Sequence, residues 1–261
     1  MTKIGLFDSG VGGLSVWRAV ARTLPQHDLV YFADQKYCPY GLRSQQEIRA
    51  LTARITKFLV AQNCRVIVVA CNTASAAALY FLRETFPHVS FIGMEPAVKP
   101  AASATRSGKI AVLATRGTLE GELFHHTRNE FARNVQALTV YPTDWVERVE
   151  RADIDSVETF ESVRGVIEPL LDAGVDEIAL GCTHYPFLAP VIENIAAGRA
   201  SILNPSDAVA KQTARVVAES ALPPTRNATQ TYYTSGNVAE FGRVLQKLLG
   251  PQAAEIAFSP I

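Results

Sequence analysis

The chain has 261 residues, of which 48% are hydrophobic and 19% charged, a composition that supports a packed core and excludes extensive disorder. Lysine and arginine total 25, as do aspartate and glutamate, and this zero net charge argues against a nucleic-acid-binding protein. Apolar runs such as 66–71 and 76–82 are far shorter than the roughly 20 residues of a membrane span. No secretory signal precedes Asp8, so we predict a cytoplasmic protein with no membrane partner.

Strand-like and helix-like segments alternate through the first part of the chain. A strand at Lys3–Asp8 leads through a glycine-rich turn into a helix at Leu14–Leu24. A second strand follows at Asp28–Ala33, and a polar, turn-rich stretch then precedes a helix at Gln45–Gln62. The β-branched run Val66–Ala70 lacks polar alternation, which is typical of a parallel strand buried on both faces. We therefore expect a parallel sheet covered by helices.

The same alternation begins again after Pro96. Expected here are strands at 109–114, 137–141 and 177–180, a helix at 155–173 that ends at Gly174, and a final helix at about 238–249. The sequence thus predicts an α/β protein of two similar lobes, each a mainly parallel sheet layered with helices, with the active site in the cleft between them. We assign residues 1–97 plus 208–261 to the first lobe and 98–207 to the second.

Four cysteines are present, and none of them forms a C-x-x-C pair: Cys38, Cys64, Cys71 and Cys182. Neither a zinc ribbon nor a disulfide framework is indicated, and a buried cysteine is often only a small hydrophobe. Two of them have a more specific context. Cys71 follows the strand 66–70 and precedes a helix at 74–85, while Cys182 follows the strand 177–180 and precedes Pro186, a residue favoured in a first helical turn.

Each of these two cysteines is therefore expected at the carboxyl end of a parallel strand, one in each lobe. Ligands bind at that edge of open α/β sheets. A helix N-terminus also favours a thiolate, so we expect lowered thiol pKa values for both. If the lobes face each other, two thiols flank one cleft. That arrangement suits racemisation, in which a proton leaves one face of a carbon and another is added to the opposite face.

Five stretches in order along the chain carry a resemblance to a known family: Phe7–Val16, Tyr31–Asp34 with Cys38–Gly41, Ala70–Ser75, Glu95–Ala97 and Gly181–Pro186. In combination they resemble the cofactor-independent glutamate racemases of the aspartate/glutamate racemase family. The resemblance implies that Cys71 takes the α-proton of D-glutamate and Cys182 that of L-glutamate. It places Asp8 beside the first thiol and His184 beside the second, where they assist proton transfer. It implies no metal and no cofactor.

The resemblance also implies where the substrate binds. The expected contacts come from the turns after several strands: Asp8, Ser9, Tyr40, Gly41, Asn72, Thr73, Thr183 and His184, with Thr115 and Thr118 as further candidates. Glu150 matches a third carboxylate of the family, although a solvated surface charge is an equally good interpretation. The expected partner is glutamate alone, the biological role is the supply of D-glutamate for peptidoglycan, and a homodimer is compatible with the family.

Several alternatives remain at this point. Gly10 and Gly12 follow the first strand and Asp34 ends the second, as in a dinucleotide-dependent dehydrogenase, but Ser15 stands where the third glycine belongs. An aspartate racemase, a hydantoin racemase or a related decarboxylase would share the fold, although a decarboxylase would keep one cysteine. A zinc site on Cys182 and His184 would need further ligands. A periplasmic binding protein would need an export signal.

Overall fold

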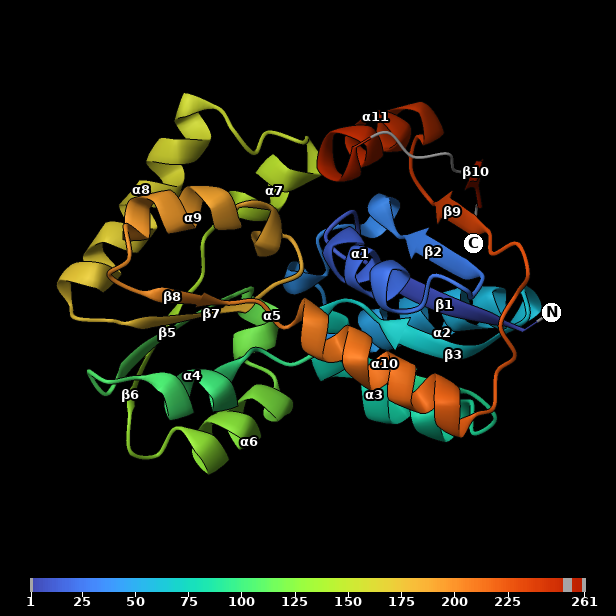
Figure 1. Ribbon diagram of the computed structural model, residues 1–261, viewed down its shortest axis with the longest axis horizontal. Helices are drawn as coiled ribbons and strands as arrows, with labels where there is room; N and C mark the ends of the chain where they lie inside the picture. The colour runs from blue at the N-terminus through green and yellow to red at the C-terminus, as the bar shows by residue number, and fades with distance from the viewer. Residues whose placement is uncertain (1, 251–254, 260–261) are drawn as a thin grey trace.

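The structure, a computed structural model, describes residues 2–250 and 255–259. Within those ranges the chain forms two parallel sheets that lie side by side with helices on both faces (Figure 1), which confirms the predicted two-lobe α/β class. None of the described helices is both long and apolar enough to cross a membrane.

The first sheet has six strands, and every neighbouring pair is parallel. Its order across the sheet is β10 (Glu255–Phe258), β9 (Gln230–Thr234), β2 (Leu29–Ala33), β1 (Lys3–Asp8), β3 (Cys64–Val69) and β4 (Ser90–Ile92). Both faces of the central strands are apolar: Leu6 and Val68 face one core cluster, and Phe7 and Val69 face another. The alternation follows from the two-residue period of a strand, and it explains why these segments lack polar positions.

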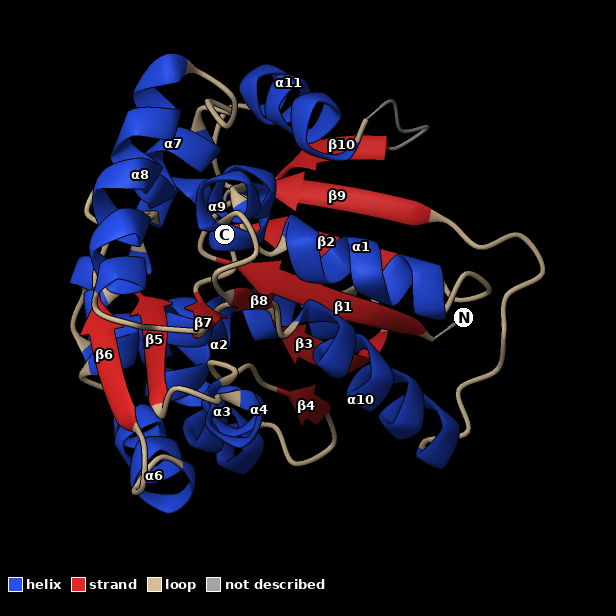
Figure 2. Ribbon diagram, turned by 60° about the vertical axis from the view of Figure 1, so that its left-hand side comes forward, coloured by secondary structure: helices blue, strands red, loops and turns tan. Residues whose placement is uncertain are grey.

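Helices cover both faces of this sheet. The helices α1 (Leu14–Thr23) and α10 (Ser206–Glu219) pack on one face, and α2 (Gln45–Ala61) and α3 (Asn72–Thr85) on the other. The helix α2 begins with a capping box between Ser44 and Glu47, and α11 (Val238–Leu249) begins at an Asn237 cap. Figure 2 shows α1 and α10 in front of the strands.

The second sheet is smaller and also entirely parallel. Its order is β6 (Gln136–Val140), β5 (Lys109–Ala114), β7 (Glu177–Gly181) and β8 (Ser201–Leu203). The helices around it are α4 (Val98–Ala104) and α6 (Glu122–Phe131) on one face, α8 (Val157–Asp172) and α9 (Ala189–Ala196) on the other, and the short α5 (Arg116–Leu119) and α7 (Trp145–Glu150) near the carboxyl ends of its strands.

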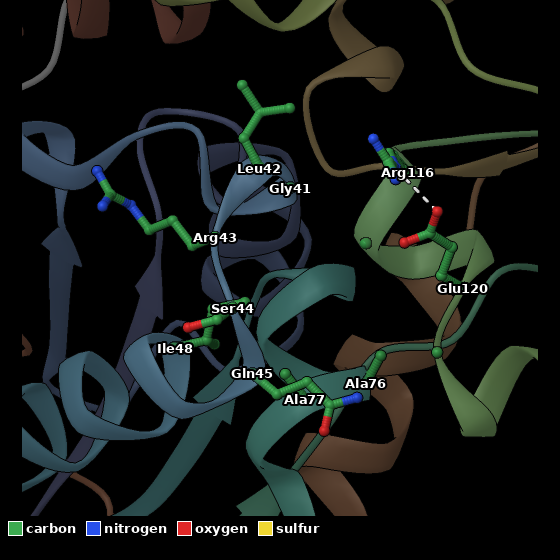
Figure 3. Close-up of a pocket in the computed structure, with 12 residues that line it drawn as sticks. Gly41, Leu42, Arg43, Ser44, Gln45, Ile48, Ala76, Ala77, Arg116 and Glu120 are labelled. Carbon is green, nitrogen blue, oxygen red and sulfur yellow. Dashed lines mark hydrogen bonds and ion pairs between the residues drawn. The ribbon is translucent and has the colours of Figure 1, made fainter.

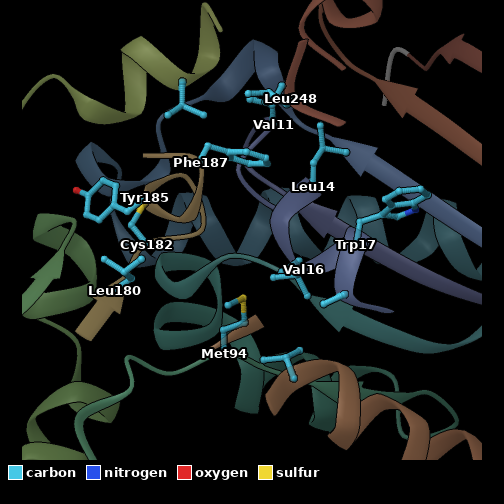
Figure 4. Packing of buried hydrophobic residues seen from close by; sticks show 14 of the residues in the cluster. Val11, Leu14, Val16, Trp17, Met94, Leu180, Cys182, Tyr185, Phe187 and Leu248 are labelled. Carbon is cyan, nitrogen blue, oxygen red and sulfur yellow. The ribbon is translucent and has the colours of Figure 1, made fainter. Parts of the chain in front are cut away.

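The chain passes between the sheets after β4 and again after β8, where it enters α10. Because α10 packs on α1 and begins at Ser206, the return to the first sheet comes slightly before the predicted residue 208. One core cluster runs from the first sheet to the second (Figure 4), where Leu14 and Trp17 belong to the same packed group as Tyr185 and Phe187. The two sheets thus share this cluster, while the opposite face of each sheet packs on a cluster of its own.

One local prediction was wrong. No α-helix begins at Pro186; instead a 3-10 turn, η3 (Tyr185–Phe187), is followed by α9 starting at Ala189. Pro190 is the cause, because it has no N–H to bond the carbonyl of Pro186 and its ring would clash with that group in a continuous helix. The chain therefore makes 3-10 hydrogen bonds here, such as Phe187 N to His184 O at 3.1 Å.

Candidate active site

The two singled-out cysteines lie at the facing carboxyl edges of the two sheets. Cys71 follows β3 and is the N-cap of α3, and Cys182 directly follows β7. Both line a single small cavity between the lobes, with room for little more than one water molecule (about 20 Å³). The residues around it are Ser9, Pro39, Tyr40, Gly41, Cys71, Asn72, Thr73, Thr115, Val146, Cys182, Thr183 and His184. The tertiary structure therefore brings both thiols to one small space.

Cys71 is held in a dry environment. Its Sγ accepts a hydrogen bond from the backbone N–H of Ala74 at 3.4 Å and faces the Ser9 hydroxyl at 3.9 Å. Burial raises the pKa of the Cys71 thiol well above its ordinary value, and the negative charge of Asp8 raises it further. The expectation that the helix N-terminus would lower this pKa was wrong, because the single amide of Ala74 does not offset desolvation and a like charge.

Asp8 is held by the turn that follows β1. Its Oδ2 accepts hydrogen bonds from the N–H groups of Gly13 at 3.0 Å and Gly10 at 3.2 Å, and the hydroxyl of Thr183 lies 3.5 Å from Oδ1. Burial raises its pKa, against the opposing effects of His184 and the turn amides. Asp8 therefore holds the turn that precedes α1 and also presents its carboxyl group to Cys71.

Cys182 lies beside an acid–imidazole pair. Its Sγ is 3.6 Å from Nδ1 of His184, whose Nε2 is 2.7 Å from Oε1 of Glu150. Burial lowers the His184 pKa, but hydrogen bonds to Cys182, Cys38 and Glu150 outweigh it and raise the pKa well above its ordinary value. Burial raises the Glu150 pKa, but the charge and hydrogen bond of His184 and the hydrogen bonds from Val11 and Gln35 together outweigh it and lower the pKa. The alternative of a solvated Glu150 was wrong, since its side chain is 17% exposed and paired.

Glu150 is anchored across the lobe boundary. Its Oε1 also accepts the N–H of Val11 at 2.7 Å, and its Oε2 accepts from Nε2 of Gln35 at 3.1 Å. The glycine turn after β1 makes room for this: a Cβ at Gly10 would overlap the Glu150 carboxylate, and one at Gly12 would overlap the His184 ring. Glycine is therefore needed at both positions, because side chains of the other lobe occupy the space that a Cβ would fill.

That packing removes the dehydrogenase alternative. The turn expected to cradle a pyrophosphate is filled by Glu150 and His184. Asp34, the expected ribose ligand, is buried and accepts hydrogen bonds from the hydroxyls of Tyr40 at 2.6 Å and Ser235 at 2.7 Å. Its carboxylate instead secures the loop that carries Tyr40 to the cavity.

Polar groups suited to a carboxylate line the cavity at Asn72, Thr73 and Thr115, and Thr118 contacts both threonines. The hydroxyls of Thr73 and Thr115 are 2.8 Å apart, and that of Thr118 lies 3.0 Å from Thr115 and 3.3 Å from Thr73. The side-chain amide of Asn72, which is 3% exposed, has no hydrogen-bond partner among the described residues. A buried amide without a partner is costly, so this group is available to a bound polar ligand.

A second pocket of about 410 Å³ adjoins the cavity at Gly41. Figure 3 shows it between the segment Leu42–Gln45 of the first lobe and Arg116 and Glu120 of the second, with Ala76 and Ala77 of α3 below. Arg116 and Glu120 form an ion pair at 2.8 Å. Gly41, which the sequence predicted as a substrate contact, lines both this pocket and the cavity.

Sequence reasoning missed two side chains of this region. Gln35 contacts Glu150, and Cys38, which was set aside as a packing residue, lies with Glu150 and His184 in one group. Both residues lie in the same short loop as Tyr40 and Gly41, which the sequence predicted as substrate contacts. That closeness in sequence could have identified them. Among the described residues, the group of side chains that could hold a metal ion is Cys38, Glu150 and His184. Cys182 is not part of this group, so the suggested zinc pair of Cys182 and His184 gains no further ligand from it.

Comparisons with known proteins show which family the chain belongs to. The family model for Asp/Glu/Hydantoin racemases matches residues 11–213. The glutamate racemase of Roseiflexus sp. (strain RS-1) is 47% identical over 248 residues, 94% of this chain and 91% of its own. The solved structure of Escherichia coli glutamate racemase in complex with L-glutamate and the activator UDP-MurNAc-Ala has a TM-score of 0.87 at 28% identity and covers 99% of both chains. That of the Francisella tularensis enzyme in complex with D-glutamate has a TM-score of 0.85 at 25% identity, covering 99% of this chain and 97% of its own. The chain therefore belongs to the Asp/Glu/hydantoin racemase family.

Proposed function

We propose that this protein is a cofactor-independent glutamate racemase, an isomerase that interconverts L- and D-glutamate. The observation that carries the proposal is the placement of Cys71 and Cys182, from different lobes, on one small cavity. The curated relatives at 42–47% identity are glutamate racemases, which favours glutamate over aspartate or a hydantoin as the substrate.

In the direction from L to D, the thiolate of Cys182 removes the α-proton of L-glutamate. The electron pair of the broken C–H bond passes to the α-carbon and is delocalised into the adjacent carboxylate. The thiol of Cys71 then donates its proton to the opposite face, which leaves Cys182 as a thiol and Cys71 as a thiolate. The reverse reaction begins from that state. A single base would return the proton to the face it came from.

The neighbouring charged groups support the two thiols differently. His184, held by Glu150, is positioned to stabilise a thiolate on Cys182, because its Nδ1 faces that sulfur. Burial and, in addition, the Asp8 charge raise the pKa of Cys71 and thereby keep its sulfur protonated and ready to donate. In this assignment Asp8 acts on Cys71, and His184 acts on Cys182.

The substrate carboxylates are assigned to hydrogen-bond donors rather than to an arginine. The donors that line the cavity are the hydroxyls of Ser9, Thr73, Thr115 and Thr183 and the free Asn72 amide. The hydroxyl of Thr118 supports them through its contacts with Thr73 and Thr115. Fixed donors in a water-excluding site stabilise developing negative charge more strongly than water does. They would therefore stabilise the α-carboxylate as it gains enediolate character.

Catalysis requires that this cavity open. Its free volume of about 20 Å³ is too small for glutamate, so the lobes must separate to admit it. We place the hinge at the two crossings between the sheets, after β4 and after β8, and the entrance at the pocket of Figure 3. In the bacterial cytoplasm such an enzyme would supply D-glutamate for peptidoglycan.

Incubation with L-glutamate in deuterated water, without added metal or pyridoxal phosphate, tests the proposal. Optical activity should decay to zero as deuterium enters the α-carbon. L-Aspartate at the same concentration is the control and should react at least about 100-fold more slowly, since a shorter chain cannot fill both carboxylate sites. Retained optical activity with L-glutamate would contradict the function, and equal rates would contradict the substrate.

A further inference from the structure

Three metal-binding side chains meet at the outer edge of the cleft. The Cys38 sulfur, a carboxylate oxygen of Glu150 and a ring nitrogen of His184 all lie within 4.8 Å of one another. Cys38 and Glu150 are half-buried and His184 is buried. In the part of the chain that the structure describes, no other group of three or more such residues is arranged in this way.

The donor types indicate which ion would fit. Thiolate, imidazole and carboxylate are the ligands that zinc combines, at about 2.3 Å for sulfur and about 2.0–2.2 Å for nitrogen and oxygen. Ligand atoms around a tetrahedral ion are then about 3.3–3.7 Å apart. Side-chain movements of about one ångström would bring the three atoms to that spacing, with water at the fourth position. Magnesium and calcium prefer oxygen-only sites and would not suit this sulfur.

An ion could reach the group without passing through the catalytic cavity. A pocket of about 380 Å³ opens on the outer side and is lined by both Cys38 and Glu150. Its walls carry charges of both signs, with Glu147 and Glu240 beside Lys36 and Arg151. His184 lies at the boundary, because it also lines the cavity that contains Cys71 and Cys182.

The three side chains come from both halves of the molecule. Cys38 lies between η1 (Gln35–Tyr37) and η2 (Tyr40–Leu42), just after β2 of the first sheet. Glu150 ends α7 and His184 follows β7 of the second sheet. We propose that Cys38, Glu150 and His184 bind a divalent ion of the zinc class, and that the ion inhibits the enzyme by tying the lobes together.

Two consequences of binding lead to inhibition, and both rest on the proposed function. An ion on Nε2 of His184 replaces the 2.7 Å contact with Glu150 and fixes the imidazole that serves Cys182. A bond between the lobes also opposes the opening that the closed cavity requires for glutamate to enter. Binding itself needs neither substrate nor turnover, so it can be measured separately.

The binding experiment uses the full chain, freed of metal by a chelator and titrated with Co²⁺ and then Zn²⁺. Co²⁺ should produce a sulfur-to-cobalt charge-transfer band that Zn²⁺ removes. Cys38→Ala should abolish the band and weaken Zn²⁺ binding by at least about 100-fold, since it removes a direct ligand. Cys64→Ala is the matched control, because Cys64 is a buried cysteine of the same lobe outside this group. Cys38→Ser, which keeps the side-chain size, repeats the comparison if the alanine variant does not fold.

The activity experiment measures racemisation at buffered free Zn²⁺, relative to the metal-free rate of each variant. The unmodified protein and Cys64→Ala should be inhibited at the Zn²⁺ concentration that displaces Co²⁺, whereas Cys38→Ala should not. If Cys38→Ala keeps both the cobalt band and the inhibition, the ion binds at Cys71 and Cys182 and the proposal is overturned. Absence of the band in the unmodified protein also overturns it, whether or not glutamate is racemised. Failure to racemise glutamate with the band present would refute the function but leave the metal site.

Discussion

The two cysteine turns look alike in the sequence and differ in the structure. Cys71 caps a regular α-helix, and its sulfur has the Ala74 amide, Ser9 and the Asp8 carboxylate as neighbours. Cys182 precedes a 3-10 turn and lies beside the buried pair of His184 and Glu150. A carboxylate thus serves one sulfur and an imidazole the other. Two similar strand-end turns therefore provide two chemically different proton-transfer groups.

The largest effect should come from removing either sulfur. Cys71→Ala and Cys182→Ala should each lower the racemisation rate by about 10³-fold or more, because one face of the α-carbon loses its acid or base. The remaining thiol can still exchange a proton on its own face. In deuterated water, proton NMR should therefore show Cys71→Ala labelling L-glutamate and Cys182→Ala labelling D-glutamate without inversion. The opposite labelling pattern would mean that Cys71 acts on L-glutamate and Cys182 on D-glutamate. As the control, Cys64→Ala should racemise glutamate like the unmodified protein.

The His184–Glu150 pair should come next. Glu150→Gln keeps the shape of the side chain but removes the charge that orients His184, so kcat/KM should fall by about 100-fold. The two enantiomers are equal in free energy, so kcat/KM must fall by the same factor in both directions. The separate kcat values for L- and D-glutamate can nevertheless change unequally, and initial rates from both enantiomers measure this. Unchanged kinetics would mean that the catalytic role of His184 does not require the Glu150 charge.

The packing of the glycine turn after β1 against Glu150 can be tested through protein stability. Gly10→Ala places a methyl group on the Glu150 carboxylate, and the resulting overpacking should destabilise the protein by about 1–3 kcal/mol. Gly165→Ala is the matched control, because its Cβ meets nothing within 4 Å in the interior of α8. That change should stabilise the protein by about 0.5–1 kcal/mol. Thermal unfolding of both variants gives the comparison, and similar melting temperatures would show that Glu150 moves aside freely.

The smallest effect concerns the pKa of Cys71. Burial raises this pKa, and the Asp8 charge adds to the increase. Asp8→Asn removes the charge but not the burial, so the pKa should fall while staying above its ordinary value. The thiolate fraction at a fixed pH near 8 should then rise, and iodoacetamide should alkylate Cys71 faster, as peptide mass spectrometry can follow. A slower reaction would mean that Asp8 lowers the Cys71 pKa instead.

Local sequence patterns were sufficient to predict much of the fold and part of the candidate site. The unalternating run in β3 predicted a parallel strand, and β7 was predicted as a hydrophobic strand. Cys71 and Cys182 each come within two residues of the end of their strand, so their place at the sheet edge could be read from the sequence. His184 stands two residues after Cys182, which made their proximity predictable. The short strands β4 and β8 were missed, because three residues carry too little periodicity to be recognised.

The contacts between the lobes and the pKa of Cys71 were decided only by the tertiary structure. Glu150 bonds the backbone of Val11 across 139 positions of sequence, and Cys38 reaches it from a loop of the other lobe. No local pattern encodes such contacts, since they exist only once two separately formed sheets are packed together. The Cys71 pKa depended on packing in the same way: a helix N-terminus is visible in the sequence, but the burial that outweighs it is produced by the surrounding lobes.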